Sequence, residues 1–265
     1  MRSTLPSLPL LCAAMALLAS PAQAEPKWEG AIGLLASDSP AYQGASERKL
    51  KVHPGFFLRY GRFSITNTGG FVSRSSDEVV RGVGFEMVRS DAVRVSLGLR
   101  YDGGRGEDSA NGLAGMGDVK NTVRARIAAN WRLDEQWRVS ASWNVDAFGR
   151  GGGNLGEIGL QHERRLGPHT VWTAGSSLTV AGDRYLQSYF GVSPEQAARS
   201  GYPVFETGSG LRDIAVSTGF RTEFGPRWIG LAGIGVSHLL GPAADSPLTG
   251  RTTTFGVNAG LAWRF

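Results

Sequence analysis

The chain has 265 residues, of which 38 are glycine and one is cysteine, and its formal net charge is +5 at neutral pH. Glycine exceeds its average share of about 7% but is dispersed without a repeat, which excludes collagen. No stretch after residue 24 is long and apolar enough for a membrane-spanning helix, which excludes a helical membrane protein. A transmembrane β-barrel is still compatible, because alternating strands average to near-neutral hydropathy.

Residues 1–24 have the pattern of a secretory signal. Arg2 is an early cation, Leu8–Leu18 is a short apolar run, and Ala22-Gln23-Ala24 forms an A-x-A cleavage site. We therefore expect cleavage near Ala24 and one domain over residues 25–265. The only cysteine, Cys12, lies in the signal, so we expect neither disulfides nor thiolate metal sites in the mature chain. Secretion argues against nucleic acid as the partner of this basic chain and favours lipid phosphates or acidic wall polymers.

The rest of the chain reads as about twelve strands of alternating polarity. Between residues 93 and 102, for example, valine, leucine and tyrosine alternate with arginine, serine, glycine and aspartate. A period of two is typical of a strand with one apolar and one polar face. Spans 28–37 and 227–239 alternate less clearly, because glycine and alanine occupy both faces. The expected strands are 28–37, 50–60, 62–72, 79–89, 93–102, 119–133, 137–148, 155–166, 169–181, 211–224, 227–239 and 252–265.

The connections between these spans alternate between short and long. Short connections such as Gly61-Arg62 and Gly225-Pro226 contain turn-forming residues. Outer-membrane barrels have short periplasmic turns and longer external loops, with aromatic residues near the strand ends. The sequence therefore predicts an all-β fold: a single antiparallel transmembrane β-barrel of about 12 strands in the Gram-negative outer membrane.

The final strand gives the clearest signal. Phe255, Val257, Leu261, Trp263 and Phe265 alternate with small or polar residues up to the last position. This pattern is similar to the terminal assembly signal of outer-membrane barrels, in which the apolar side chains face lipid.

The polar face of the expected strands is rich in arginine. Because carboxylates such as Asp102 and Glu163 lie on the same face, two interpretations are open: an anion-favouring pore, or a narrow lumen in which neighbouring charges pair. The mixed signs favour pairing. The lumen-facing candidates are Arg59, Arg94, Arg100, Arg124, Arg126, Arg138 and Arg221.

The connection 182–210 is too long to be a simple turn, and loops of this length are usually functional. Ser193 and Pro194 are typical of a helix start, as N-cap and first residue, followed by helix formers until Gly201. Aromatic residues either fold this loop into the barrel mouth, which we favour, or are presented to a partner. The loop candidates are Tyr189, Phe190, Tyr202 and Phe205.

We do not expect this protein to be an enzyme. None of the four histidines lies in a recognisable nucleophile or metal-ligand pattern. His162-Glu163 comes nearest, yet adjacent strand residues point to opposite faces. We expect no catalytic residues, no cofactor and no metal site, and we expect residues 103–118 to be a flexible loop.

Three segments carry a resemblance to a known family. Tyr189–Asp213 (YFGVSPEQAARSGYPVFETGSGLRD) resembles the signature loop of the MipA/OmpV family of outer-membrane proteins, and Pro40–Gly44 and Ala259–Phe265 also match. The resemblance runs from about Trp28 to Phe265. It implies a scaffold that bridges a lytic murein transglycosylase and a bifunctional penicillin-binding synthase.

Other members of the family are described as antigens, adhesins or porin-like proteins, so a channel or adhesin is the alternative, and a lipid-acting enzyme is a second one. The family has no catalytic residues to carry over. A periplasmic partner should touch the short turns rather than the external loop 182–210. The oligomeric state and the identity of the partners stay open.

Overall fold

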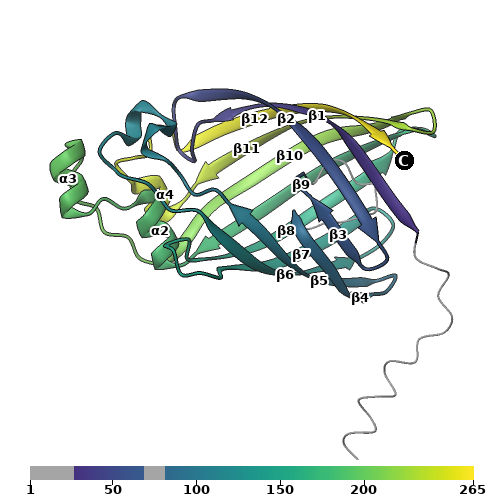
Figure 1. The fold of residues 1–265 in the computed structure, drawn as a ribbon, viewed down its shortest axis with the longest axis horizontal. Helices are drawn as coiled ribbons and strands as arrows, with labels where there is room; N and C mark the ends of the chain where they lie inside the picture. The colour runs from purple at the N-terminus through teal and green to yellow at the C-terminus, as the bar shows by residue number, and fades with distance from the viewer. Residues whose placement is uncertain (1–26, 69–80) are drawn as a thin grey trace, which may run out of the picture.

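The computed structural model describes residues 27–68 and 81–265. The described residues form twelve strands that close into one antiparallel barrel, each strand pairing with its neighbours in sequence and β1 pairing with β12 (Figure 1). The strands are β1 (Trp28–Pro40), β2 (Arg48–Tyr60), β3 (Phe63–Thr66), β4 (Gly82–Arg89), β5 (Val93–Asp102), β6 (Thr122–Arg132), β7 (Trp137–Asp146), β8 (Asn154–Arg165), β9 (Thr170–Ala181), β10 (Gly210–Phe224), β11 (Trp228–Leu239) and β12 (Thr253–Arg264). The predicted fold class is confirmed. The predicted signal segment 1–24 lies outside the described residues.

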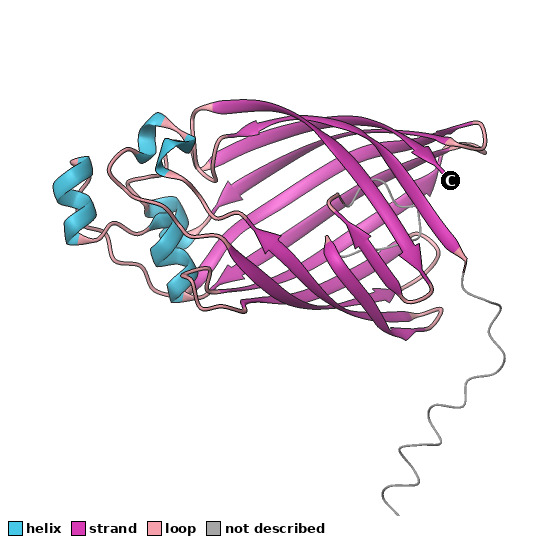
Figure 2. Ribbon diagram, viewed as in Figure 1, coloured by secondary structure: helices cyan, strands magenta, loops and turns pink. Residues whose placement is uncertain are grey.

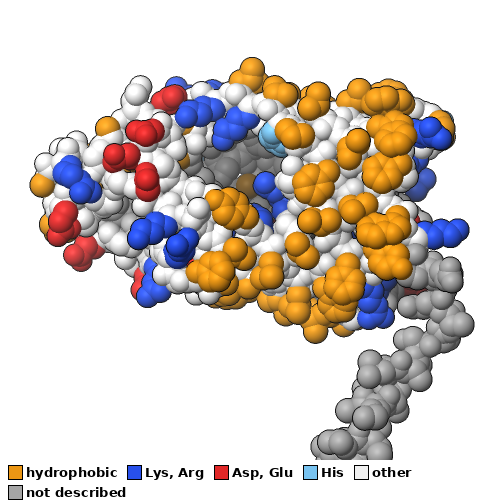
Figure 3. Space-filling model, in the orientation of Figure 1, with side chains coloured by type: hydrophobic (Ala, Val, Ile, Leu, Met, Phe, Trp, Pro, Cys, Tyr) orange, Lys and Arg blue, Asp and Glu red, His pale blue; other side chains and the backbone are white. Residues whose placement is uncertain are grey.

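The alternation along each strand separates an apolar outer face from a polar inner one. Leu97, Leu99 and Tyr101 of β5 are exposed, whereas the intervening Gly98 is buried and Arg100 is half-buried. Hydrophobic side chains cover the strand region in Figure 3, and charged side chains gather beyond it. An exposed apolar band around a closed barrel is the surface that a bilayer requires. No helix among residues 27–68 and 81–265 is long and apolar enough to span a membrane.

The two ends of the barrel differ, as the alternation of short and long connections predicts. Connections of two to four residues lie at one end, here called the turn end. Their geometry follows from their residues: Gly61 and Gly225 adopt positive φ angles of 58° and 69°, which glycine takes without strain. Asp134 accepts hydrogen bonds from the backbone amides of Gln136 and Trp137, both at 2.7 Å.

The opposite end, here called the loop end, carries the long connections and all the helices of the described residues (Figure 2). These are the α-helices α2 (Asp183–Phe190), α3 (Pro194–Ser200) and α4 (Gly241–Asp245), with the 3-10 helices η2 (Glu107–Ser109) and η3 (Asn111–Leu113). Both η2 and η3 fall in residues 103–118, which we expected to be a flexible loop. That segment is instead folded, with Leu113 and Met116 buried.

The closing strands β1, β11 and β12 contain small residues on their inner face. A Cβ at Gly33 would lie 2.1 Å from the carbonyl oxygen of Leu261, so only glycine fits this close approach of β1 to β12. Ala31, Phe57 and Ala262 form a buried cluster beside it. Spans 28–37 and 227–239, whose alternation is weak, are therefore full strands in which small residues allow close packing.

The strand boundaries differ from prediction where loop structure begins. The expected strand 119–133 is β6, which starts at Thr122 because residues 105 and 119 already pair in the preceding loop. The expected strand 62–72 corresponds to β3, which ends at Thr66. There the Thr66 hydroxyl lies 2.6 Å from the carbonyl oxygens of both Phe56 and Thr68 and donates its one proton to either of them. Residues 69–80, which include parts of two expected strands, lie outside the described residues.

Candidate functional site

Helix α2 lies across the barrel mouth at the loop end (Figure 1). Its side chains Tyr185, Leu186 and Phe190 are buried and pack against Leu239 of β11 and Ala243 of α4. We call α2 the plug helix. In sequence it shows apolar residues at 185, 186, 189 and 190, a helical spacing that would have predicted it.

Tyr185 shows how the plug helix is tied to distant parts of the wall. Its hydroxyl donates to Gln43 Oε1, from the β1–β2 loop, at 3.2 Å, and it accepts from Arg212 Nη1 of β10 at 3.2 Å. The guanidinium of Arg124, from β6, lies 5.4 Å from the ring centroid. Contacts with the β1–β2 loop and with strands β6 and β10 fix the helix over the lumen.

Arg105 holds the end of the plug helix from the β5–β6 loop. It is 8% exposed, and its guanidinium donates to the carbonyl oxygens of Tyr189 and Ser188. A cation at the carboxyl end of a helix is favoured by the exposed carbonyls and the helix dipole. Burial lowers the pKa of Arg105 below its ordinary value, and the neighbouring Tyr42, Tyr189 and Tyr185 oppose that shift.

Arg124 and Asp102 form an ion pair between β6 and β5 below the plug helix. Arg124 is only 1% exposed. Its Nη2 donates to the carbonyl oxygen of Gly152 at 2.9 Å, while its Nη1 is buried without an acceptor among the described residues. A second pair joins Arg212 to Asp213, because a bulge between Leu211 and Asp213 shifts the register of β10 there.

These groups surround a cavity of about 420 Å³ beneath the plug helix, which we call the cationic cavity. Asp102 is the only carboxylate among its described lining residues. Burial raises the pKa of Tyr189 in this lining to about 12. Its cations are Lys51, Arg100, Arg105, Arg124 and Arg212, and its tyrosines are Tyr42, Tyr185 and Tyr189.

Ion pairs elsewhere run along the wall rather than across the lumen. Arg138 Nη2 lies 3.1 Å from Glu163 Oε2 between β7 and β8. Arg59 Nη1 lies 4.0 Å from Glu29 Oε2 between β2 and β1. Glu223 receives Arg221 at 2.9 Å from its own strand and Arg264 at 3.3 Å. The partners lie on adjacent strands in the first two pairs, on one strand for Arg221 and Glu223, and on strands separated by β11 for Arg264 and Glu223.

The remaining lumen-facing candidates lie on β5 and β6. Arg94 and Arg100 stand opposite Asn130 and Arg124 in the register, and Arg126 stands opposite Gly98. The seven candidate arginines are thus distributed along the barrel, and only Arg100 and Arg124 reach the cationic cavity. Sequence reasoning did not select Arg105 and Arg212, because a loop and a bulge, neither of which has strand periodicity, place them there.

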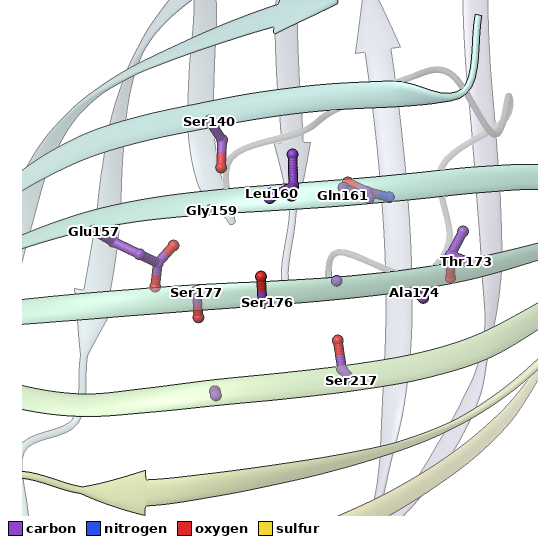
Figure 4. Close-up of a pocket in the computed structure, with 12 residues that line it drawn as sticks. Ser140, Glu157, Gly159, Leu160, Gln161, Thr173, Ala174, Ser176, Ser177 and Ser217 are labelled. Atoms are coloured by element: carbon purple, nitrogen blue, oxygen red, sulfur yellow. The ribbon is translucent and has the colours of Figure 1, made fainter. Parts of the chain in front are cut away.

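A second recess, of about 290 Å³, lies in the wall of β7 to β10. Figure 4 shows Ser140, Glu157, Ser177 and Ser217 around it. The recess exists because serine and glycine occupy the inner face of four neighbouring strands. Glu157 is the only carboxylate among its described lining residues.

The four loop candidates separate into two groups. Tyr189 and Phe190 belong to the plug helix and contact the barrel mouth. Tyr202 and Phe205 instead pack against a buried cluster of Met116, Val192 and Leu248, which joins three loops above the mouth. Helix α3 projects beyond them (Figure 1), with the expected Ser193 cap completed by Gln196 as a capping box.

Two of the four histidines contact aromatic or hydroxyl side chains. His162 lies between the rings of Trp137 and Trp172, with centroids 4.6 and 5.6 Å away. His238 Nδ1 lies 2.7 Å from the hydroxyl of Thr253. Residues 27–68 and 81–265 contain no group of three or more histidine, cysteine or acidic residues placed to hold a metal ion.

The closed barrel, its apolar band and its polar, charged interior define a membrane β-barrel of the outer-membrane type. The family model described as "MltA-interacting protein MipA" matches residues 32–265. The chain belongs to the MipA family, as the sequence resemblance indicated. A comparison with curated proteins finds no match.

Solved porins and channels share the barrel architecture at low similarity. The KdgM porin is 8% identical, with a TM-score of 0.42, covering 89% of this chain and 99% of its own. The NanC porin is 6% identical, with a TM-score of 0.43, covering 89% and 100%. The outer membrane channel DcaP of Acinetobacter baumannii is 10% identical, with a TM-score of 0.38, covering 91% and 97%. Similarity at this level carries no inference about what the barrel transports or binds.

Proposed function

We propose that this barrel is a non-enzymatic scaffold that links a lytic murein transglycosylase and a penicillin-binding synthase to the Gram-negative outer membrane. The family description, a protein that interacts with MltA, supports this role. The structural observation that carries it is the plug helix, whose contacts with Gln43, Arg124 and Arg212 occupy the mouth of the lumen. A barrel with an occupied mouth is better suited to present surfaces than to pass solutes.

The partner surface in this proposal is the turn end. Murein enzymes work in the periplasm, and outer-membrane barrels place their short turns on that side. Asp91 and Glu135 are exposed turn residues whose side chains form no hydrogen bond or ion pair with the described residues. Exposed arginines, among them Arg165 and Arg227, complete a rim of mixed charge. Such a rim can bind a partner of complementary charge without disturbing the barrel.

The test is affinity capture of the murein enzymes with matched charge reversals at the two ends. Asp91→Lys with Glu135→Lys changes the turn end. Asp108→Lys with Glu206→Lys makes the same charge change at exposed positions of the loop end. We expect the first variant to lose the transglycosylase and synthase, and the second to retain them, when both insert at wild-type levels.

Capture that depends on the loop-end pair instead would show that the partner binds the opposite side. Capture of neither enzyme by the intact barrel would contradict the scaffold and favour the alternatives. If the turn-end variant still captures the transglycosylase and the synthase, the turn-end rim is not the partner surface.

A channel is the second candidate, favoured by the recess of about 290 Å³ and by ion pairs between adjacent strands, such as Arg138–Glu163. An adhesin would use α3, which projects beyond the mouth. A lipid-acting enzyme has less support, because His162 contacts two tryptophans rather than a nucleophile. A conductance measurement in planar bilayers separates the channel from the scaffold, because a channel should give large current steps and a plugged scaffold should not.

A further inference from the structure

We propose that the cationic cavity beneath the plug helix is a binding site for a multivalent organic anion that carries carboxylate or phosphate groups. This site goes beyond the scaffold role, since it lies at the end of the barrel opposite to the turn-end rim. Its volume of about 420 Å³ is within the range of small-molecule pockets, about 300–1,000 Å³.

The first support is an excess of positive charge. Asp102 pairs with Arg124, and Asp213 pairs with Arg212, so two of the five cations are compensated. Lys51, Arg100 and Arg105 form no ion pair with any carboxylate of the described residues. Lys51 is exposed, Arg100 half-buried and Arg105 buried, and three uncompensated cations around one cavity create a positive potential inside it. An anion with two or three charges matches that potential.

The second support is that two of these cations have no structural task in the described residues. Arg105 holds the plug helix through the carbonyls of Ser188 and Tyr189. Lys51 and Arg100 make no hydrogen bond or ion pair there, although both line the cavity. Like charges gathered without partners destabilise the fold. A bound anion offsets that cost.

The third support is the donor chemistry of the wall. Arginine presents a planar fork of N–H groups that binds carboxylate or phosphate in a bidentate manner. Tyr42 donates its hydroxyl to the carbonyl oxygen of Leu248 at 2.9 Å and faces Arg105 with its ring, 5.9 Å from the guanidinium. The stacked rings of Tyr185 and Tyr189, 4.5 Å apart, cover another side. Aromatic walls with guanidinium groups suit an organic anion that has an apolar or ring-shaped body.

The experiment is calorimetric titration of the purified, folded barrel in detergent at low ionic strength. The probes are citrate and pyrophosphate, with glucose as a neutral control and spermidine as a cationic one. Lys51→Gln with Arg100→Gln removes two cavity cations that hold nothing in place. Arg132→Gln with Arg165→Gln is the matched control, because it removes two exposed cations at the turn end.

We expect citrate or pyrophosphate to bind the wild-type barrel, and glucose and spermidine not to bind. The cavity variant should bind at least tenfold more weakly, because the two removed cations can no longer form charge-assisted hydrogen bonds with the anion. The control variant should bind like the wild type. Tighter binding of citrate identifies a carboxylate ligand, and tighter binding of pyrophosphate a phosphorylated one.

Three results would overturn the site: no anion binding by the wild type, equal weakening in both variants, or equal binding of glucose. Heat-modifiable migration of each variant on gels verifies that it is folded. The murein-enzyme capture described above is a separate measurement, so failure of one proposal does not decide the other.

Discussion

Phe265 and Gly30 form a reciprocal pair that closes the barrel. The Phe265 amide donates to the Gly30 carbonyl at 3.0 Å, and the Gly30 amide donates to the Phe265 carbonyl at 3.2 Å. A Cβ at Gly30 would lie 2.5 Å from the Phe265 ring, so the ring rests directly on the glycine. The last residue of the sequence therefore belongs to the seam between β12 and β1.

Deletion of Phe265 should lower the amount of inserted barrel, because it removes both hydrogen bonds and the aromatic contact from the seam. The measurement is the heat-modifiable fraction in isolated outer membranes, with degraded protein sought in the periplasm. Phe265→Leu is the matched control: it keeps the backbone bonds and should give an intermediate yield. Normal insertion of the deletion variant would contradict this role.

Removal of Arg124 should destabilise the barrel by about 3–5 kcal/mol, because Asp102, whose side chain is only 18% exposed, then loses its ion-pair partner. The double variant Asp102→Asn with Arg124→Gln should recover part of that loss. Urea unfolding of the four proteins of this cycle in detergent measures the coupling free energy. Additive effects would show that the pair contributes nothing to stability.

The wild-type barrel should show little steady conductance in planar bilayers, since the plug helix occupies the mouth. Replacement of residues 183–209 by a short Gly-Ser connector should produce larger, stable current steps. The Asp108→Lys, Glu206→Lys variant controls for charge at the loop end without removing the helix. Large steps in the wild type would favour the channel, and substitutions at Arg94 or Arg124 should then change ion selectivity.

The plug helix should detach at high pH. Burial raises the pKa of Tyr189 to about 12, and Asp102 and Tyr185 add to this while Arg124 opposes it. Because the folded value exceeds the unfolded value of about 10, the neutral phenol stabilises the plug fully below about pH 10. That stability is lost as the pH rises through about 12.

Limited proteolysis of the 182–210 connection across this pH range measures the detachment. Tyr189→Phe cannot ionise and should resist cleavage to a higher pH than the wild type. Identical pH profiles for the two proteins would assign the transition to another group.

Strand periodicity predicted the barrel because each face of a strand meets a single environment: one face meets lipid and the other meets the lumen. The alternation of Phe255 to Phe265 and of Val93 to Tyr101 required no knowledge of neighbouring strands. The same logic identified arginine positions such as Arg124 and Arg138 on the polar faces. The helix start at Ser193 and Pro194 was equally local, since adjacent residues determine it.

The cationic cavity was not predicted, because loops and register assemble it. Tyr42, Arg105 and Tyr185 are far apart in sequence and meet only when three loop-end connections fold together. The position of Arg212 depends on a bulge in the register of β10. Periodicity indicates which face a residue occupies, but not which distant side chain lies opposite.

The ion pairs along the wall have a consequence for how the barrel is built. Arg59–Glu29, Arg124–Asp102 and Arg138–Glu163 each join two strands that are consecutive in the chain. Each of these three carboxylates therefore meets its cation as soon as one hairpin forms. The exception is Arg264–Glu223, which links β12 to β10 and so forms only near the end of assembly. A nascent barrel can add hairpins in order with these three carboxylates already paired, and the Phe265–Gly30 seam of the final strand closes it.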